Sequence, residues 1–147
     1  MEMTMIYIIS DIHGCYDEYL ELLKKIQFND EDELFVLGDV VDRGPQPVKV
    51  LKDMLEYLEE FSLYEELFVG EKRYILVHAG LNGFKDENTF LVTGHTPTFG
   101  IRKDGKQLVY EENGHLAIDC GCVYGGKLAA YCLDTGEIFY VDENVEK

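Results

Sequence analysis

The chain of 147 residues contains few basic side chains. It has 13 lysines and arginines against 29 aspartates and glutamates, which gives a formal net charge of −16. This charge repels a nucleic-acid backbone, because such binding depends on basic groups that displace counterions from phosphates. We therefore expect no nucleic-acid partner. Small anionic substrates are not excluded, since bound cations would supply local positive charge.

Long apolar runs are also absent. No stretch approaches the roughly 18 apolar residues of a membrane-spanning helix, and no charged segment followed by an apolar one opens the chain. The four cysteines, Cys15, Cys120, Cys122 and Cys132, form no CxxC pair. We expect neither membrane insertion nor secretion, and we expect free thiols in a reducing cytoplasm.

Apolar residues make up 46% of the chain, which is enough to bury the core of one domain spanning residues 1–147. The first half alternates buried strands at 5–10 and 34–37 with amphipathic helices at 16–26 and 48–60. The second half changes to strand-like runs. These lie at 63–69, 73–78, 90–93, 107–111, 116–118, 127–133 and 138–141, with a hairpin turn at Asp134-Thr135-Gly136 before the last. The pattern predicts an α/β fold.

Carboxylate, imidazole and guanidinium side chains lie directly after four of these strands. They belong to Asp11-Ile12-His13-Gly14, Gly38-Asp39-Val40-Val41-Asp42-Arg43-Gly44, His78-Ala79-Gly80 and Gly94-His95-Thr96-Pro97. Ligands of open α/β sheets bind beyond the carboxyl ends of strands, so these side chains predict a metal site. Each motif alone has a plain alternative, because Asp and His near glycine suit any turn. Their joint occurrence favours the metal site.

In this order, the motifs DIHG, GDVVDRG, VHAG and VTGHTP resemble those of the calcineurin-like metallophosphoesterases. They resemble specifically the bacterial phosphoprotein-phosphatase branch, that of the serine/threonine phosphatases, which also includes the symmetrical diadenosine tetraphosphatases. The tail AIDCGCVYGGKLAAYCLDTGEIFYV extends the match to residues 7–141. The resemblance implies a metallophosphatase-type β-sandwich flanked by helices, here in a trimmed form. It also implies hydrolysis of a phosphorylated protein or a small phosphoester.

The resemblance further implies two divalent metal ions, which could be manganese, iron or zinc. Asp11 and His13 would hold the first ion, Asp39 would bridge both, and His78 and His95 would hold the second. Two such ions lower the pKa of a bridging water, which becomes the attacking hydroxide, and clamp the phosphoryl oxygens.

Arg43 and Asp42 would be the catalytic side chains beside the metals. The guanidinium of Arg43 would bind the substrate phosphate, since its planar fork matches phosphate oxygens. Asp42 would orient a neighbouring histidine instead of binding metal.

One family motif has no counterpart in the sequence. Gly-Asn-His-Glu, or Gly-Asn-His-Asp, supplies an asparagine ligand for the second metal and a histidine general acid. It would fall near residues 60–63, and a further phosphate-binding arginine of the family would fall near 83–86. His115, Asn82 or Asn88 could replace the missing ligand, although each lies in a turn-like segment that needs no function.

Three interpretations follow from the missing motif. The protein is an impaired enzyme, a non-catalytic metal- or phosphate-binding module on a phosphatase scaffold, or a protein whose written sequence lacks residues at these two junctions. Of these three, the enzyme is the favoured interpretation.

Overall fold

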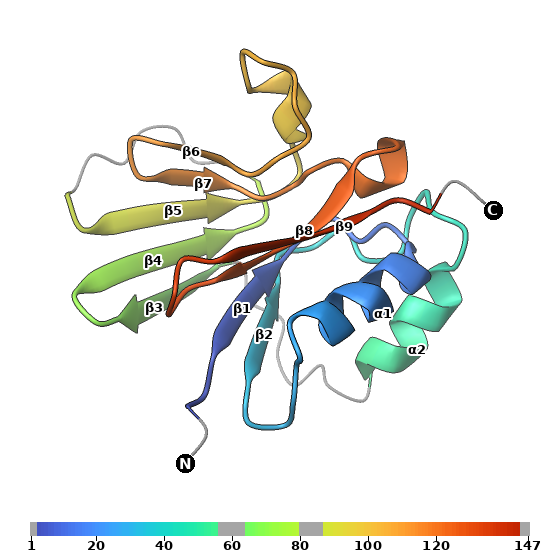
Figure 1. Ribbon diagram of the computed structural model, residues 1–147, viewed down its shortest axis with the longest axis horizontal. Coiled ribbons are helices and arrows are strands. Elements are labelled where there is room, and N and C mark those ends of the chain that lie inside the picture. Colours follow the sequence, from blue (N-terminus) through green and yellow to red (C-terminus); the bar gives the residue numbers. More distant parts are fainter. Residues whose placement is uncertain (1–2, 56–63, 80–86, 145–147) are drawn as a thin grey trace.

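The structure, a computed structural model, describes residues 3–55, 64–79 and 87–144. These residues form two helices and two β-sheets (Figure 1). The first sheet has the order β2-β1-β8-β9, and the second has the order β3-β4-β5-β7-β6. In chain order the elements are β1 (Ile6–Ile9), α1 (Tyr16–Lys25), β2 (Glu33–Val36), α2 (Pro47–Leu55), β3 (Glu65–Val69), β4 (Lys72–Val77), β5 (Thr89–Thr93), β6 (Tyr110–Glu112), β7 (His115–Ala117), β8 (Lys127–Cys132) and β9 (Ile138–Asp142), with single 3₁₀ turns η1 (Thr98–Gly100) and η2 (Cys122–Tyr124).

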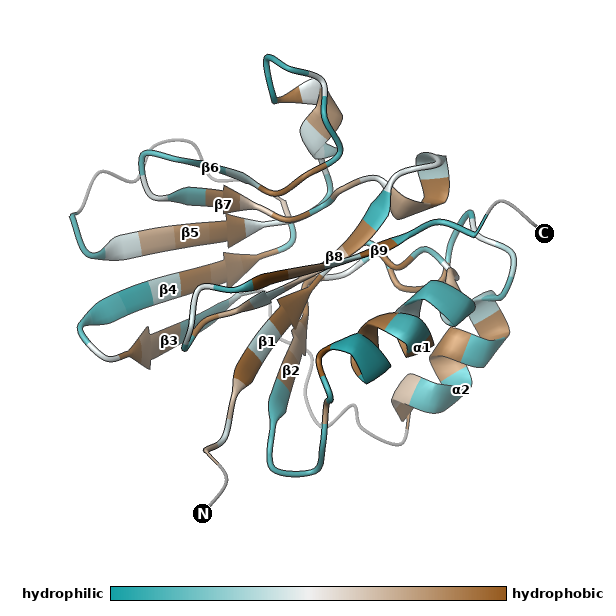
Figure 2. Cartoon of the chain, in the orientation of Figure 1, coloured by the Kyte–Doolittle hydropathy of each residue, from teal (hydrophilic) through white to brown (hydrophobic). Residues whose placement is uncertain are grey.

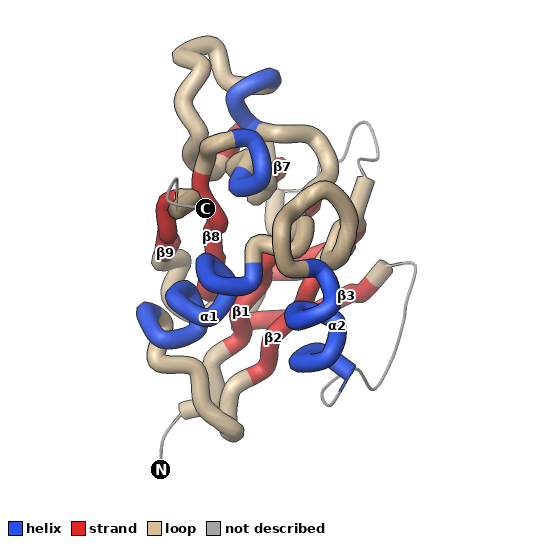
Figure 3. Tube along the Cα trace, turned by 90° about the vertical axis from the view of Figure 1, so that its right-hand side faces the viewer, coloured by secondary structure: helices blue, strands red, loops and turns tan. Residues whose placement is uncertain are grey.

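The molecule has three layers, and β1 lies in the middle one. Both helices lie on one side of β1 and β2 (Figure 3), and the second sheet covers the opposite face. Side chains alternate along a strand, so Ile9 packs under the helices while Ile8 packs between the sheets. β8 divides its side chains in the same way, with Ala130 on the helix side and Tyr131 between the sheets. Two apolar cores result.

Helix α1 is amphipathic, as its sequence pattern predicts. Tyr19 and Leu22 are buried against the first sheet. Asp17 lies in the first turn and Lys24 in the last, where each charge interacts favourably with the helix dipole. In Figure 2, both helices carry polar and apolar residues in alternation, whereas β1 and β5 are mainly apolar. Helix α1 connects the parallel strands β1 and β2, and its apolar side covers their sheet.

Most predicted elements are present with shifts of one or two residues at their ends. β1 and β2 pair in parallel, and β8 and β9 form the predicted antiparallel hairpin. Helix α2 begins at Pro47, a favoured first position for proline, and ends at Leu55. The predicted continuation of this helix to residue 60 lies outside the described residues, as do both junctions at 60–63 and 83–86.

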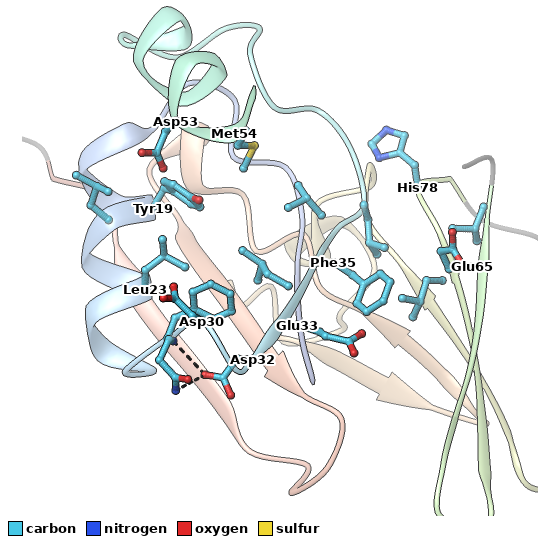
Figure 4. A pocket seen from close by; sticks show the side chains of 18 of the residues that line it. Tyr19, Leu23, Asp30, Asp32, Glu33, Phe35, Asp53, Met54, Glu65 and His78 are labelled. Atoms are coloured by element: carbon cyan, nitrogen blue, oxygen red, sulfur yellow. Dashed lines mark hydrogen bonds between the residues drawn. The ribbon is translucent and has the colours of Figure 1, made fainter. Parts of the chain in front are cut away.

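Two strand predictions need correction. The sequence predicts a second strand buried on both faces, but β2 is the edge of its sheet and its residues are exposed or half-buried. A pocket of about 900 Å3 lies beside it, with Leu23, Phe35 and His78 among the lining side chains (Figure 4). The strand predicted at 107–111 begins only at Tyr110, because the Val109 N–H donates to the Tyr140 hydroxyl, 3.1 Å away, and not to a neighbouring strand.

The described helices are too short and too polar to cross a lipid bilayer.

The two-core arrangement predicts that neighbouring residues of β1 are equally important for stability. Ile8→Ala and Ile9→Ala should each lower the free energy of unfolding by about 2–5 kcal/mol, because each leaves a cavity in a different core. Met3→Ala, at a side chain that is 75% exposed, should change it by about 0.5 kcal/mol or less. Urea denaturation of the three variants measures this. A normal stability for either isoleucine variant would contradict the three-layer arrangement.

Candidate metal centre

The carboxyl ends of strands from both sheets meet at one place. β1 and β2 run parallel in the first sheet, and β4 and β5 run parallel in the second. Figure 1 shows the four arrowheads pointing toward the middle of the molecule. The backbone N–H of His95, beyond β5, donates a 2.9 Å hydrogen bond to Asp11 Oδ2, beyond β1. This bond joins the two sheets at the candidate site.

All five predicted ligands are brought together there. Asp11, His13 and Asp39 form one group, and Asp39, His78 and His95 form a second, with the ligand atoms of each group within 4.8 Å of one another. Asp39 Oδ2 is common to both, at 3.6 Å from His13 Nε2, 3.4 Å from His78 Nε2 and 3.6 Å from His95 Nδ1. One carboxylate oxygen therefore lies among three imidazoles.

The chemistry of these side chains fits divalent cations. Asp11 is 1% exposed, and its Oδ1 has no hydrogen-bond partner. Burial, followed by the negative charge of Asp119, raises the pKa of the Asp11 carboxyl well above its usual range. Among the described residues, the side chains within ion-pair distance of Asp11 and Asp39 are histidines only. A cation would supply the missing positive charge, and this mixture of carboxylate and imidazole suits manganese, iron and zinc.

Asp42 determines which nitrogen of His13 faces the site. His13 Nδ1 lies 2.8 Å from Asp42 Oδ1, and this hydrogen bond lowers the pKa of Asp42. A proton on Nδ1 leaves the lone pair of Nε2 directed at Asp11 and Asp39. Carboxylates commonly orient metal-binding histidines in this manner.

The backbone around the site adopts conformations that are unusual for residues with a side chain. Five of the seven non-glycine residues with positive φ in the described chain carry predicted site side chains. These are Asp11 (54°), His13 (47°), Asp39 (48°), Arg43 (76°) and His95 (66°). Such left-handed conformations persist only where the surrounding structure holds them, and they concentrate at functional sites.

Two glycines allow the loops to approach each other. A Cβ at Gly94 would overlap Ser10 Oγ and Asp11 Oδ2, and one at Gly44 would overlap the backbone oxygen of His13. Larger residues at either position would separate the strand ends that carry the candidate ligands. The glycines of GDVVDRG and VTGHTP thus have a packing role beside the polar residues.

Asp119 is a site residue that the sequence reasoning missed. It follows β7, is 3% exposed, and accepts a 2.9 Å hydrogen bond from the Gly121 N–H at Oδ1. Its charge acts on Asp11, and burial raises the pKa of Asp119 itself. The signal was available, because Asp119 ends an apolar run and precedes Cys-Gly, as Asp11 ends the first strand.

Other predicted residues lie outside the two ligand groups. The side chain of Arg43 is 56% exposed, and its Nε lies 3.4 Å from Asp42 Oδ2. His115 Nε2 lies 2.8 Å from the Thr93 hydroxyl, and neither group of possible ligands in the described chain includes it. Asn82 lies outside the described residues. Asn88 directs its backbone oxygen to the Arg73 N–H.

A two-sheet sandwich whose strand ends gather aspartates and histidines defines a metallophosphatase-type protein. The family model described as calcineurin-like phosphoesterase matches residues 4–78, just over half of the chain. The chain belongs to this family.

Relatives carry the name symmetrical bis(5'-nucleosyl)-tetraphosphatase. The protein of Buchnera aphidicola subsp. Acyrthosiphon pisum (strain 5A) is 45% identical over 87 residues, which cover 57% of this chain and 30% of that protein. That of Buchnera aphidicola subsp. Schizaphis graminum (strain Sg) is 40% identical over 107 residues, 71% of this chain and 36% of that protein. The chain thus spans about a third of the length of the curated relatives it matches.

A solved structure supports the fold over nearly the whole chain. The crystal structure of a protein assigned as a diadenosine tetraphosphatase has a TM-score of 0.75, and the match covers 97% of this chain and 95% of that one. The sequence identity is 19%, so this similarity concerns the fold alone. The predicted metallophosphatase fold, two sheets flanked by helices, is confirmed.

The shared position of Asp39 predicts that its loss affects every bound metal. The parent protein should retain about one tightly held ion per chain after dialysis, because the Asp11 group is buried whereas the His95 group is more exposed and lacks the family's asparagine. Asp39→Asn should weaken metal affinity by about tenfold or more, since even outer-shell partners of a metal commonly contribute that much.

Elemental analysis and metal titration measure this effect. Asp30→Asn, at an exposed acid in the loop before β2, is the matched control and should retain the parent's metal content. Folded parent protein that binds no metal would contradict the site as a whole, and unchanged binding in Asp39→Asn would remove Asp39 from it.

Proposed function

We propose that the protein is a metal-dependent phosphoester hydrolase that uses Asp11, His13, Asp39, His78 and His95 as metal ligands. The observation that supports this most directly is the position of Asp39 Oδ2 within 3.6 Å of an imidazole nitrogen from each of three histidines. As a member of both ligand groups, Asp39 would help to hold two cations close to one phosphate. The family membership supports the same reaction class.

Each side chain has a distinct task in this proposal. When bound, the ions supply Lewis-acid chemistry, which polarises phosphoryl oxygens and lowers the pKa of water. Asp42 keeps the Nδ1 proton on His13 and so directs Nε2 to the metals. Arg43, exposed beside Asp42, binds the non-bridging phosphate oxygens with its guanidinium.

No histidine of the chain remains to act as general acid. The sequence has four histidines, and three of them belong to the ligand groups. The fourth, His115, bonds to Thr93, and burial lowers its pKa. A general acid typically contributes about a hundredfold to ten-thousandfold in rate, so substrates with poor leaving groups should be hydrolysed slowly.

The missing acid favours a phosphoanhydride over a phosphoserine as substrate. A nucleotide leaves as a stable phosphate anion and scarcely needs a proton, whereas a serine alkoxide does. The relatives' names indicate dinucleoside tetraphosphates, so we propose a small dinucleoside polyphosphate substrate in preference to a phosphoprotein. The ions are manganese, iron or zinc. The four free cysteines fit a cytoplasmic location.

Arg43→Ala should weaken the binding of inorganic phosphate to the manganese-loaded protein by about tenfold, because charge-assisted hydrogen bonds to the anion are lost. Metal content should not change, since the guanidinium contacts substrate and not the ions. Arg73→Ala, which breaks a 2.7 Å pair with Glu66 on the β3–β4 hairpin, is the matched control. Titration calorimetry measures both variants. Equal phosphate affinity in Arg43→Ala and the parent would exclude the proposed role of Arg43.

The absence of a general acid predicts a strong dependence on the leaving group. With manganese, hydrolysis of 4-nitrophenyl phosphate should be slow but measurable, and hydrolysis of phosphoserine should be slower by about a hundredfold or more. Steady-state rates on the two esters test this. Comparable, fast rates on both would reveal an acid that the described residues do not supply. Inactivity on both, with metal bound, would instead support the non-catalytic alternative.

A further inference from the structure

We propose that Tyr124 is a positioning residue for Arg43. Its ring holds the guanidinium in place to receive the substrate phosphate. The inference rests on the proposed function, because it requires Arg43 to bind phosphate, and it concerns a residue to which neither the motifs nor the ligand groups assign a role.

The guanidinium of Arg43 lies near both an aromatic ring and a carboxylate. Its Cζ is 5.7 Å from the centre of the Tyr124 ring, and its Nε is 3.4 Å from Asp42 Oδ2. Asp42 in turn lies 2.8 Å from His13 Nδ1. A continuous series of contacts therefore runs from a candidate metal ligand through Asp42 and Arg43 to Tyr124.

The turn that carries Tyr124 is rigidly built. Its ends are Gly121 and Gly125, with left-handed φ values of 71° and 81°. The N–H groups of Tyr124 and Gly126 each donate a 2.9 Å hydrogen bond to the Gly121 oxygen. Cys122 is 1% exposed and anchors the turn in the core beneath the helices. The backbone of Tyr124 is thus fixed although 47% of the residue is exposed.

The same turn is connected to the metal centre. Asp119, whose charge acts on Asp11, accepts a hydrogen bond from the Gly121 N–H at its carboxylate. Its backbone oxygen accepts a 2.8 Å hydrogen bond from the Thr98 N–H, beyond β5. The turn that carries Tyr124 is therefore connected to the strand ends that place the candidate ligands.

The geometry suits the capture of an anion by Arg43. A long, exposed side chain loses considerable rotamer freedom when it binds, and prior immobilisation reduces that cost. A ring attracts a cation above it without using the hydrogen-bond donors of the guanidinium, so these donors stay available for phosphate oxygens. The Asp42 carboxylate lies beside the Nε of this guanidinium.

The experiment is a double-mutant cycle read by the affinity for inorganic phosphate, a ligand without an aromatic group that could stack on Tyr124. Tyr124→Leu should weaken phosphate binding to the manganese-loaded protein by about two- to fivefold, the range expected for an exposed cation–π contact. Tyr124→Phe keeps the ring and should retain the parent's affinity. In the Arg43→Ala background, Tyr124→Leu should have no further effect.

Phe68→Leu is the matched control, because Phe68 is 69% exposed and pairs with Arg73 at the end of β4 opposite to His78. Metal content should be equal in all variants. An equal loss from Tyr124→Leu with and without Arg43 would overturn the positioning role, because Tyr124 would then act on the ligand directly. Unchanged affinity in Tyr124→Leu would overturn it as well. If Arg43→Ala itself binds phosphate normally, the proposed function of Arg43 has failed, and that result is distinguishable from a failure confined to Tyr124.

Discussion

The structure depends above all on the buried carboxylate of Asp11 at the junction of the two sheets. Its Oδ2 accepts hydrogen bonds from the His95 N–H and the Ser10 hydroxyl, and its Oδ1 faces His13 Nε2 at 3.6 Å. The carboxylate of Asp119 is also buried, and its negative charge repels that of Asp11. Such a cluster is costly to bury without a compensating cation. The arrangement of the strand ends is therefore understandable as a cradle for metal.

Sequence reasoning was strongest for features that local patterns determine. The apolar runs at β1 and β2, the helical spacing of α1 and the residues that follow each strand all depend on nearby sequence. The motifs around Asp11 and Asp39 were therefore sufficient to propose these two residues as ligands. His78 and His95 follow the same rule at β4 and β5, although these strands lie in the other sheet.

The features that were missed depend on contacts between distant segments. The exposure of β2 follows from its place at the edge of a sheet, which apolar residues alone do not indicate. Asp119 and Tyr124 become relevant only because the segment after β7 returns to the ends of β1 and β2. Asp119 at least ends an apolar run, but an aromatic residue such as Tyr124 in a glycine-rich tail has no local signal for such a position.

In the proposed function, the site would have a nearly complete set of metal ligands and a phosphate-binding side chain, Arg43, but no histidine left to protonate a leaving group. On the proposed function, this imbalance would favour substrates whose leaving groups are stable anions, such as the proposed dinucleoside polyphosphates. Asp39 has the decisive role in the proposed site, because it alone belongs to both ligand groups of the described chain. Without the metal that Asp39 would hold, the proposed hydrolysis would be lost, whichever other residues of the chain contribute to it.

The most direct test of this account is anomalous diffraction from crystals soaked with manganese. The account predicts a strong peak between Asp11, His13 and Asp39, and a weaker one between Asp39, His78 and His95, where the candidate site is more exposed. Manganese peaks elsewhere on the surface, with none in reach of Asp39, would contradict it.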